Sequence, residues 1–363
     1  MIRILHILTS LDRGGIETML MNYYRKIDRE RFQFDFLIHR EGKFAYSDEI
    51  TKMGGHIYHI KKYNPFDKEY RRQLSHFFLD HKEYSIVHCH LNCLSALPLK
   101  MAEISGIPIR ISHSHIIIEG NSPKAIFKKI SRKFIPLYAN EFFACSEDAG
   151  RWMFGKTPFK IMPNAIDLEK FEYNADKRKI IRDKYSLNGK KVIGHVGRLT
   201  SQKNQLFLLE ICKMMSDSDI EFELVLIGEG EDENKIRSAI QEYKLEDHVL
   251  MLGSIPNVND WLQAFDIFAF PSLYEGLGIV AIEAQASGLI TICSENVPRE
   301  VKLSENCYFI SLNDKEKWIN RIMLSNNDSR KVIDLSQTDY NISVAAGKCM
   351  DRYQELCFRK DEG

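Results

Sequence analysis

The chain alternates between short runs of consecutive apolar residues and longer stretches in which apolar residues recur every three or four positions. Runs such as Arg3–Leu8 and Ile267–Phe270 have the length and composition of strands covered on both faces. Stretches such as Thr18–Lys26 and Ser95–Ile104 have the spacing of helices that bury one side. The alternation predicts parallel sheets with helices on both faces, which is an α/β fold.

The predicted strands fall into two groups, separated by a polar stretch at residues 172–190. The first group is Arg3–Leu8, Phe34–Ile38, Ile57–His59, Ile86–His88, Ile109–Ser112, Glu141–Ala144 and Lys160–Met162. The second group is Lys191–Val196, Glu223–Ile227, Val249–Leu252, Ile267–Phe270, Leu289–Cys293 and Tyr308–Ile310. Each group is large enough for a doubly wound sheet, so we expect two domains that meet near Pro163–Phe171.

Composition and charge agree with a two-domain globular protein. The 363 residues are 44% hydrophobic and 28% charged, which excludes a disordered or fibrous chain. The 50 basic and 50 acidic residues balance, so no overall charge favours nucleic acid. Residues 1–170 nevertheless carry a net charge of +7 and residues 171–363 a net charge of −7. The two halves are therefore expected to have different partners.

The sequence favours a cytoplasmic protein without a bound metal. Its first residues lack the long apolar core of a signal peptide, and no apolar run reaches the ~18 residues of a membrane span. The eight cysteines form no C-x-x-C pair, which is typical of free thiols. The cluster His88-Cys89-His90 is not expected to bind zinc, because Cys89 would point away from both histidines on a strand.

Candidate ligand-binding residues follow the predicted strand Ile267–Phe270. Gly276 and Gly278 allow a tight turn that exposes backbone N–H groups at the start of a helix, an arrangement that favours an anionic ligand. Glu283 lies on the second turn of that helix, where its carboxylate could accept ribose hydroxyls, and Glu275 could face another part of the ligand. The alternative is an ordinary helix start with two solvated glutamates.

Two cations follow the first strand of the second group. Arg198 offers a forked guanidinium and Lys203 a point charge, a combination that suits a diphosphate. The alternative is that both are ordinary surface cations. Gly14 and Gly15 follow the first strand of the chain and could likewise present backbone N–H groups to an anion, or form a plain turn.

A pair of histidines marks the end of the predicted strand Ile109–Ser112. His113 and His115 alternate along the chain, so both side chains lie on one face. A histidine at this edge could donate a hydrogen bond to a sugar hydroxyl or a phosphate. The alternative is a histidine satisfied within the core.

These segments together resemble the retaining glycosyltransferases of family 4, which have the GT-B fold. The resemblance is strongest to the bacterial branch that builds exopolysaccharide, capsule or O-antigen, and it runs along nearly the whole chain. EGLGIVAIEAQASG matches the E-x7-E signature of the family at Glu275 and Glu283, and GRLTSQKN matches its GR…K element at Arg198 and Lys203. Shorter matches are GGIE, ACSE, PNAID, LVLIGEG and FPSLYEG.

The resemblance implies two Rossmann-like domains that face each other across a cleft. The N-terminal domain, residues 1–170 with a cross-over helix at about 340–363, would bind the acceptor. Residues 171–339 would bind a nucleotide-sugar, usually a UDP-sugar. The implied reaction is retaining transfer of the sugar to a lipid-linked saccharide in the synthesis of a cell-surface polysaccharide.

The resemblance also implies roles for individual residues. Arg198 and Lys203 would neutralise the leaving diphosphate, so no metal or other cofactor is expected, and Glu283 would hold the ribose. The leaving phosphate would assist deprotonation of the acceptor. An N-domain histidine would lie near the donor sugar, with His115 preferred and His113 as the alternative. The remaining expected donor contacts are Gly14, Gly15, Ile255, Glu275, Gly276, Leu277 and Gly278.

A basic amphipathic segment, Lys124–Ile135, suggests contact with an anionic membrane surface. Its apolar residues fall on one helical face, and it contains no acid. Its cations are Lys124, Lys128, Lys129, Arg132 and Lys133. The segment predicts a peripheral protein on the cytoplasmic face of the inner membrane, near a lipid-linked acceptor. The alternative is a helix that packs its apolar face on the sheet and leaves the lysines outside.

Other functions remain as alternatives. A nucleotide-sugar epimerase or a phosphorylase would share the GT-B fold, although no motif demands the pyridoxal phosphate of a phosphorylase. A non-catalytic sugar-nucleotide-binding subunit would keep the fold without turnover. A nicotinamide-dependent oxidoreductase is disfavoured, because Gly228-Glu229-Gly230 lacks the third glycine of G-x-G-x-x-G and is followed by acids.

Overall fold

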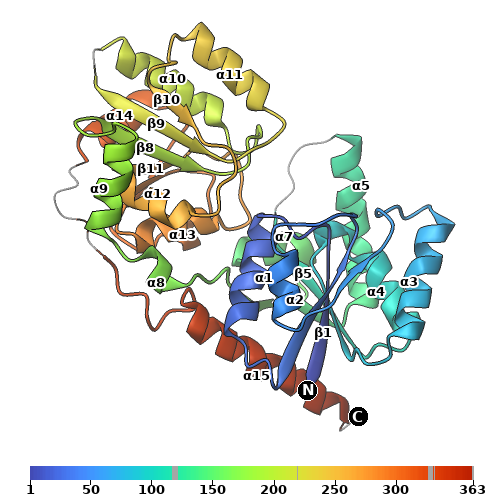
Figure 1. Cartoon of the computed structure of the whole chain (residues 1–363). Coiled ribbons are helices and arrows are strands. Elements are labelled where there is room, and N and C mark those ends of the chain that lie inside the picture. Colours follow the sequence, from blue (N-terminus) through green and yellow to red (C-terminus); the bar gives the residue numbers. More distant parts are fainter. Residues whose placement is uncertain (117–121, 219, 326–329, 331, 362–363) are drawn as a thin grey trace. The chain divides into compact units, whose positions relative to one another are not determined.

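The chain forms two compact units, which Figure 1 shows in a computed structural model. The structure describes residues 1–116, 122–218, 220–325, 330 and 332–361. Unit 1 comprises Met1–Ile166 and Gln337–Gly363, and unit 2 comprises Asp167–Ser336. The sequence analysis places the same divisions at residues 170 and 339.

Unit 1 is built on a parallel sheet, seven-stranded within the described residues, in the order β3-β2-β1-β4-β5-β6-β7. The strands are β1 (Ile2–Leu8), β2 (Phe32–Ile38), β3 (Ile57–His59), β4 (Ile86–Cys89), β5 (Ile109–Ser114), β6 (Glu141–Ala144) and β7 (Lys160–Ile161). Each neighbouring pair is parallel, so the carboxyl ends of all these strands lie along one edge.

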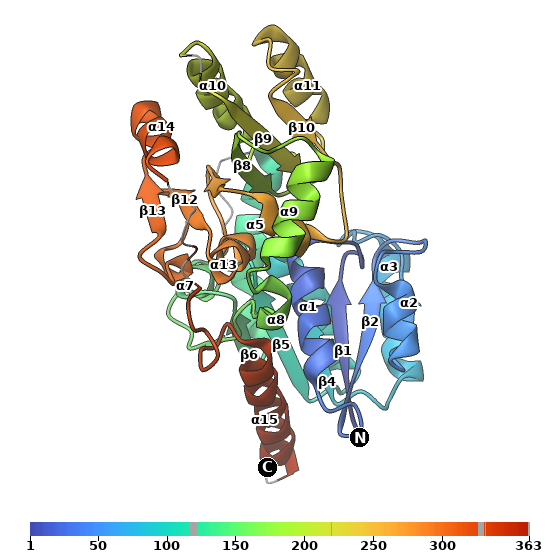
Figure 2. The ribbon, with the colours of Figure 1, turned by 60° about the vertical axis from the view of Figure 1, so that its left-hand side comes forward.

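Helices cover both faces of this sheet. On one face, α1 (Gly15–Lys26) and α15 (Ile342–Asp361) lie side by side over a core that includes Ile4, Phe34 and Tyr353 (Figure 2). The C-terminal segment therefore returns to unit 1. The remaining helical segments are α2 (Ser47–Lys52), α3 (Lys68–Asp80), η1 (Asn92–Leu94), α4 (Ala96–Ile104), α5 (Pro123–Ser131), η2 (Arg132–Phe134), α6 (Ile135–Tyr138) and α7 (Glu147–Phe154).

Unit 2 has a second parallel sheet, with the strand order β10-β9-β8-β11-β12-β13. Its strands are β8 (Lys191–Val196), β9 (Phe222–Ile227), β10 (Val249–Met251), β11 (Ile267–Phe270), β12 (Ile290–Ser294) and β13 (Cys307–Ile310). Its helical segments are α8 (Leu168–Phe171), α9 (Ala175–Lys184), α10 (Gln205–Ser216), α11 (Glu233–Glu242), α12 (Val258–Ala264), α13 (Ile279–Ala286), η3 (Arg299–Val301) and α14 (Lys315–Met323). Apolar residues of α10, α11 and α14 form the core on one face.

A buried ion-pair network ties α9 to the sheet of unit 2. Asp266, 5% exposed, accepts a hydrogen bond from the backbone N–H of Val192 and pairs with Arg178 at 2.5 Å and Arg182 at 3.2 Å. Burial by itself would raise the pKa of Asp266, but the Val192 N–H and the two guanidinium groups outweigh it and lower the pKa. The carboxylate is therefore a structural anchor at the start of β11.

The predicted strands are confirmed to within two residues at either end, whereas one predicted helix is broken. The stretch Lys124–Ile135 forms α5, then the 3₁₀ turn η2, and then α6. Pro136 lies in the first turn of α6, and its ring has no N–H to donate to the carbonyl four residues earlier. The helical ladder of α5 consequently ends before this proline.

Candidate active site

The loops at the carboxyl edge of the unit 2 sheet are bonded to one another. The loop after β8 and the loop after β11 exchange two hydrogen bonds, from Leu273 N–H to Gln202 O at 2.8 Å and from Gln202 Nε2 to Tyr274 O at 2.9 Å. Asn204 Nδ2 also donates to Pro271 O at 3.2 Å. These bonds fix the two segments that carry the predicted ligand-binding residues.

Lys203 and Glu275 form a largely buried ion pair between these loops. Lys203 Nζ lies 2.6 Å from Glu275 Oε1, and the two side chains are 18% and 7% exposed. The ammonium group also lies 4.8 Å from the centroid of the Phe270 ring, a cation–π contact that the sequence analysis does not identify. The structure thus brings together two predicted residues that lie 72 positions apart in the chain.

Gly278 makes the turn from the β11 loop into α13. Its φ of +95° lies in the left-handed region, and a Cβ atom there would approach Phe270 to 2.8 Å. Only glycine can adopt this φ and also avoid the contact with Phe270, so the turn requires glycine at this position, as the sequence analysis expects. Gly276 and Leu277 are buried in the same turn. The first residue of α13, at the positive end of the helix dipole, follows Glu275 by four positions.

Glu283 is half-buried on α13. Burial raises the pKa of its carboxyl group from 4.5 to about 7. Near neutral pH a fraction of the molecules consequently carry a protonated Glu283, which can donate as well as accept a hydrogen bond. Both capacities suit the hydroxyl groups of a sugar or a ribose.

Arg198 and Ile255 lie at the same edge of the sheet. Arg198 is exposed, and its backbone carbonyl accepts a hydrogen bond from Gln205 Nε2 at 3.0 Å. Ile255 is half-buried in the loop after β10, where the N–H of Ser254 donates to Glu229 Oε1 at 3.2 Å. In the described part of the chain, neither residue bonds to the ion pair of Lys203 and Glu275.

Gly14 and Gly15 begin helix α1 at the carboxyl end of β1. Gly14 is the N-cap with φ −108°, and a Cβ atom there would meet the flexible carboxylate of Glu17. Apart from its chain neighbours and the backbone of its own helix, no described atom lies within 4 Å of a Cβ built on Gly15. The local backbone therefore does not by itself require glycine at either position.

His113 and His115 belong to a larger cluster of buried histidines in unit 1. The cluster, which we call the histidine cluster, comprises His6, His88, His90, His113 and His115. These residues come from the adjacent strands β1, β4 and β5 and from the positions directly after β4 and β5. The alternation that groups His113 with His115 also groups His88 with His90, a signal present in the sequence as HCH and HSH.

Hydrogen bonds join the five rings into two chains. In one chain, His6 Nδ1 lies 3.0 Å from His90 Nε2, and His90 Nδ1 lies 2.9 Å from His115 Nε2. In the other chain, the Tyr353 hydroxyl lies 2.7 Å from His88 Nδ1, and His88 Nε2 lies 3.1 Å from His113 Nδ1. The sequence analysis missed Tyr353, because α15 is more than 200 residues from these strands.

Burial keeps the histidine cluster uncharged. It lowers the pKa of His6 and His115 to about 3 and lowers the pKa of the other three rings well below the ordinary value. His115 is 7% exposed and is held by its backbone N–H, which donates to Asn92 Oδ1 at 2.7 Å, whereas His113 is fully buried. The exposure favours His115 as the residue that meets a ligand.

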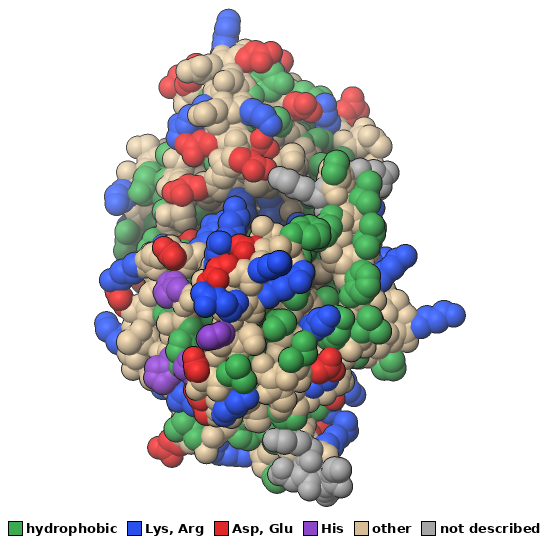
Figure 3. Space-filling view, turned by 90° about the vertical axis from the view of Figure 1, so that its right-hand side faces the viewer, with side chains coloured by type: hydrophobic (Ala, Val, Ile, Leu, Met, Phe, Trp, Pro, Cys, Tyr) green, Lys and Arg blue, Asp and Glu red, His purple; other side chains and the backbone are tan. Residues whose placement is uncertain are grey.

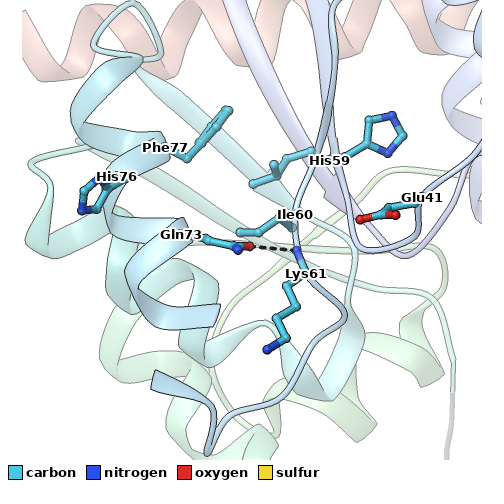
Figure 4. Close-up of a pocket in the computed structure, with 8 residues that line it drawn as sticks. Glu41, His59, Ile60, Lys61, Gln73, His76 and Phe77 are labelled. Carbon is cyan, nitrogen blue, oxygen red and sulfur yellow. Dashed lines mark hydrogen bonds between the residues drawn. The ribbon is translucent and has the colours of Figure 1, made fainter. Parts of the chain in front are cut away.

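A cavity of about 190 Å³ lies beside the histidine cluster at the carboxyl edge of the unit 1 sheet. Its lining includes Leu8, Glu17, His90, Asn92 and Lys128. A second cavity, of about 410 Å³, lies between α3 and the segments after β2 and β3 (Figure 4). Figure 4 shows Glu41, His59, Lys61 and His76 around it, and none of the predicted site residues lines it within the described chain.

The apolar side of α5 is exposed. Ile126, Phe127 and Ile130 are 46%, 37% and 51% exposed, so this side does not pack on the sheet as one alternative expects. Lys128 and Lys129 are half-buried and Lys133 is exposed, while Arg132 stacks on Trp152 at 4.3 Å. The side chain of Lys124 lies outside what the structure describes. Figure 3 shows hydrophobic and basic side chains next to one another on this side of the molecule.

Comparison with known proteins decides the class of this chain. Residues 176–339 match the family model described as glycosyl transferases group 1. The chain is 36% identical over 317 residues to the putative glycosyltransferase EpsF of Bacillus subtilis, a match that covers 82% of this chain and 80% of that protein. The chain belongs to the group 1 glycosyltransferases.

Two further similarities span this glycosyltransferase from end to end. It is 26% identical to UDP-Gal:alpha-D-GlcNAc-diphosphoundecaprenol alpha-1,3-galactosyltransferase of Escherichia coli, over 99% of this chain and 98% of that protein. Its structure superposes on Anabaena Alr3699/HepE in complex with UDP and glucose with a TM-score of 0.80, at 16% identity over 98% of this chain and 100% of that one. The predicted GT-B fold and enzyme class are confirmed. Among the described helices, none is long and apolar enough to cross a lipid bilayer.

Proposed function

We propose that this glycosyltransferase transfers a sugar, with retention of configuration, from a UDP-sugar to a lipid-linked saccharide during synthesis of a cell-surface polysaccharide. The observation that carries the proposal is the ion pair of Lys203 and Glu275 beside the start of α13. It supplies an anchored cation and a carboxylate at the carboxyl edge of a doubly wound sheet, where such sheets bind ligands.

Unit 2 binds the donor in this proposal. Arg198 and Lys203 neutralise the diphosphate, and the positive end of the α13 dipole adds to their effect. Lys203 uses one of its N–H donors on Glu275 and keeps others for a phosphate oxygen. Glu283 holds the ribose, and Glu275 with the turn at Gly276–Gly278 holds the donor sugar. The site then needs no metal ion to balance the charge of the leaving group.

The transfer exchanges one C–O bond of the donor sugar for another. The anomeric carbon forms a bond to the acceptor hydroxyl oxygen while its bond to the diphosphate breaks. The hydroxyl proton passes to an oxygen of the leaving phosphate on the same face of the sugar. His115 contacts the donor sugar through the exposed part of its ring, because its Nε2 is engaged by His90 and its Nδ1 is buried.

Two relatives support the choice of substrates. The printed name of the E. coli relative gives it UDP-Gal as donor and a diphosphoundecaprenol-linked acceptor, and the Anabaena structure contains UDP and glucose. Within this chain, the basic and apolar surface of α5 suits an anionic membrane that carries such an acceptor. Unit 1 is accordingly the acceptor-binding unit.

Thermal unfolding with nucleotides tests the donor proposal. UDP at a hundred times its Kd is expected to raise the Tm of the full chain by several degrees, equally with and without EDTA. Lys203→Ala should abolish the shift, while Lys213→Ala, which removes an exposed lysine paired with Asp217, should keep it. A shift with GDP or ADP alone would refute the UDP assignment, and a shift lost in EDTA would refute metal independence.

Flotation with phosphatidylglycerol vesicles tests the membrane proposal. The full chain should float with these vesicles at low salt and less so at high salt, because the attraction is electrostatic. Lys129→Ala with Lys133→Ala should reduce flotation, whereas Lys179→Ala on the exposed surface of α9 should not. No flotation at any salt concentration would refute the membrane contact.

A further inference from the structure

The outer part of the histidine cluster has the spacing of a metal site. His90, His113 and His115 each offer one ring nitrogen, and these three atoms lie within 4.8 Å of one another. In a tetrahedral zinc site, Zn–N bonds of about 2.0–2.1 Å place two ligand nitrogens about 3.3 Å apart. His90 Nδ1 and His115 Nε2 are already 2.9 Å apart, so small rotations of the rings would admit an ion.

The hydrogen bonds of the histidine cluster do not satisfy its buried nitrogens. His6 Nε2, His113 Nε2 and His115 Nδ1 are buried and have no partner in the described structure. A neutral imidazole carries one donor and one acceptor nitrogen. The terminal ring nitrogens of a hydrogen-bonded chain of imidazoles therefore need a partner that is not one of the histidines. An ion bound by His90, His113 and His115 would give the unpartnered Nε2 of His113 a ligand bond, because neutral imidazole nitrogens are strong ligands of transition metals.

Access to the outer histidines comes through His90 and His115, because His113 is fully buried. His90 lines the cavity of about 190 Å³, and His115 is 7% exposed. The inner residues His6 and His88 are fully buried, and Tyr353 occupies one nitrogen of His88. The cavity therefore provides an entry path and room for a water ligand that completes the coordination.

The chemistry of the ligands selects the class of ion. Cys89 packs in the hydrophobic core on the opposite face of the sheet, so the site has imidazole ligands without a thiolate. Imidazole suits Zn²⁺, Co²⁺, Ni²⁺ and Cu²⁺, whereas Ca²⁺ and Mg²⁺ require oxygen ligands. We propose that His90, His113 and His115 bind one divalent transition metal ion, with water from the adjacent cavity as the fourth ligand.

Titration with Co²⁺ tests this site directly. The full chain, stripped with a chelator and free of nucleotide, should bind one Co²⁺ with the visible absorption bands of a four- or five-coordinate ion, and Zn²⁺ should displace it. Because no substrate is present, the result is independent of the proposed sugar transfer. A stripped wild-type chain that binds no Co²⁺ or Zn²⁺ at this stoichiometry would overturn the proposal.

Variants locate the ion within the histidine cluster. His115→Asn and His113→Asn should each weaken Co²⁺ binding at least tenfold. The matched control is His39→Asn, because His39 is a buried histidine of the same unit whose nitrogens are bonded to Leu8 O and the Tyr70 hydroxyl. His39→Asn should bind Co²⁺ as the wild type does. Unchanged binding by a folded His115→Asn variant, checked by circular dichroism, would refute the assignment to the outer histidines.

Discussion

Glu283 is expected to make the stability of unit 2 depend on pH. Its pKa is about 7 in the folded chain, because burial disfavours the charged carboxylate, and returns to 4.5 when the chain unfolds. Between these values the folded state holds a proton that the unfolded state has lost. Raising the pH through this window therefore favours unfolding, and Glu283→Gln, which cannot ionise, should remove this contribution.

The magnitude follows from the two pKa values. Relative to a side chain that never ionises, Glu283 should lower the free energy of unfolding by about 0.8 kcal/mol at pH 5 and about 3.3 kcal/mol at pH 8. The free energy of unfolding of Glu283→Gln, relative to that of the wild type, should thus rise by about 2.5 kcal/mol from pH 5 to pH 8. Other titrating groups are common to both proteins and cancel in the difference.

Urea unfolding at pH 5 and pH 8 measures this difference. The fluorescence of Trp261 and Trp318, which are buried in unit 2, reports the transition of the unit that contains Glu283. Glu305→Gln is the control, because the side chain of Glu305 is 98% exposed, and its difference from the wild type should not change with pH. If Glu283→Gln differs from the wild type equally at both pH values, the folded carboxyl group is not shielded from water and the reasoning fails.

Three further substitutions test the site and the scaffold of unit 2. Arg198→Ala should lower kcat about 10²-fold with little change in unfolding free energy, since Arg198 is exposed; kcat within twofold of the wild type would contradict its role. Lys203→Ala should lower activity similarly and also cost about 3 kcal/mol in urea unfolding, because it strands the buried Glu275 carboxylate. Adding Glu275→Gln should recover most of that stability but not the activity. Asp266→Asn should destabilise unit 2 by about 3 kcal/mol, and a loss below about 1 kcal/mol would show that its arginine partners do not depend on it.

Local sequence was sufficient to locate the strands. Ile267–Phe270 and Lys191–Val196 have the same bounds in the structure as in the prediction. Buried parallel strands need apolar side chains on both faces, so each leaves an unbroken apolar run that can be read without its neighbours. The break at Pro136 is also local, but the helical periodicity of the preceding residues concealed it.

Some features of the candidate site can be predicted from a short segment of sequence. Others arise only because distant segments pair in the fold. The sequence named Lys203 and Glu275 as separate ligand groups, yet their ion pair exists only because β8 and β11 are neighbours in the sheet. The same holds for Glu283, since its position on α13 could be predicted but its pKa depends on what buries it.

The histidine cluster shows most clearly what cannot be predicted from the sequence of a single strand. Alternation along one strand determines that His113 and His115 share a face, and equally that His88 and His90 do. Only the strand order β1-β4-β5 places His6 beside His88 and both pairs next to each other. Strand order is set by packing across the whole unit rather than by the residues within a strand. The sequence therefore determined which histidines share a face of their strand, and the tertiary structure decided which of these strands became neighbours.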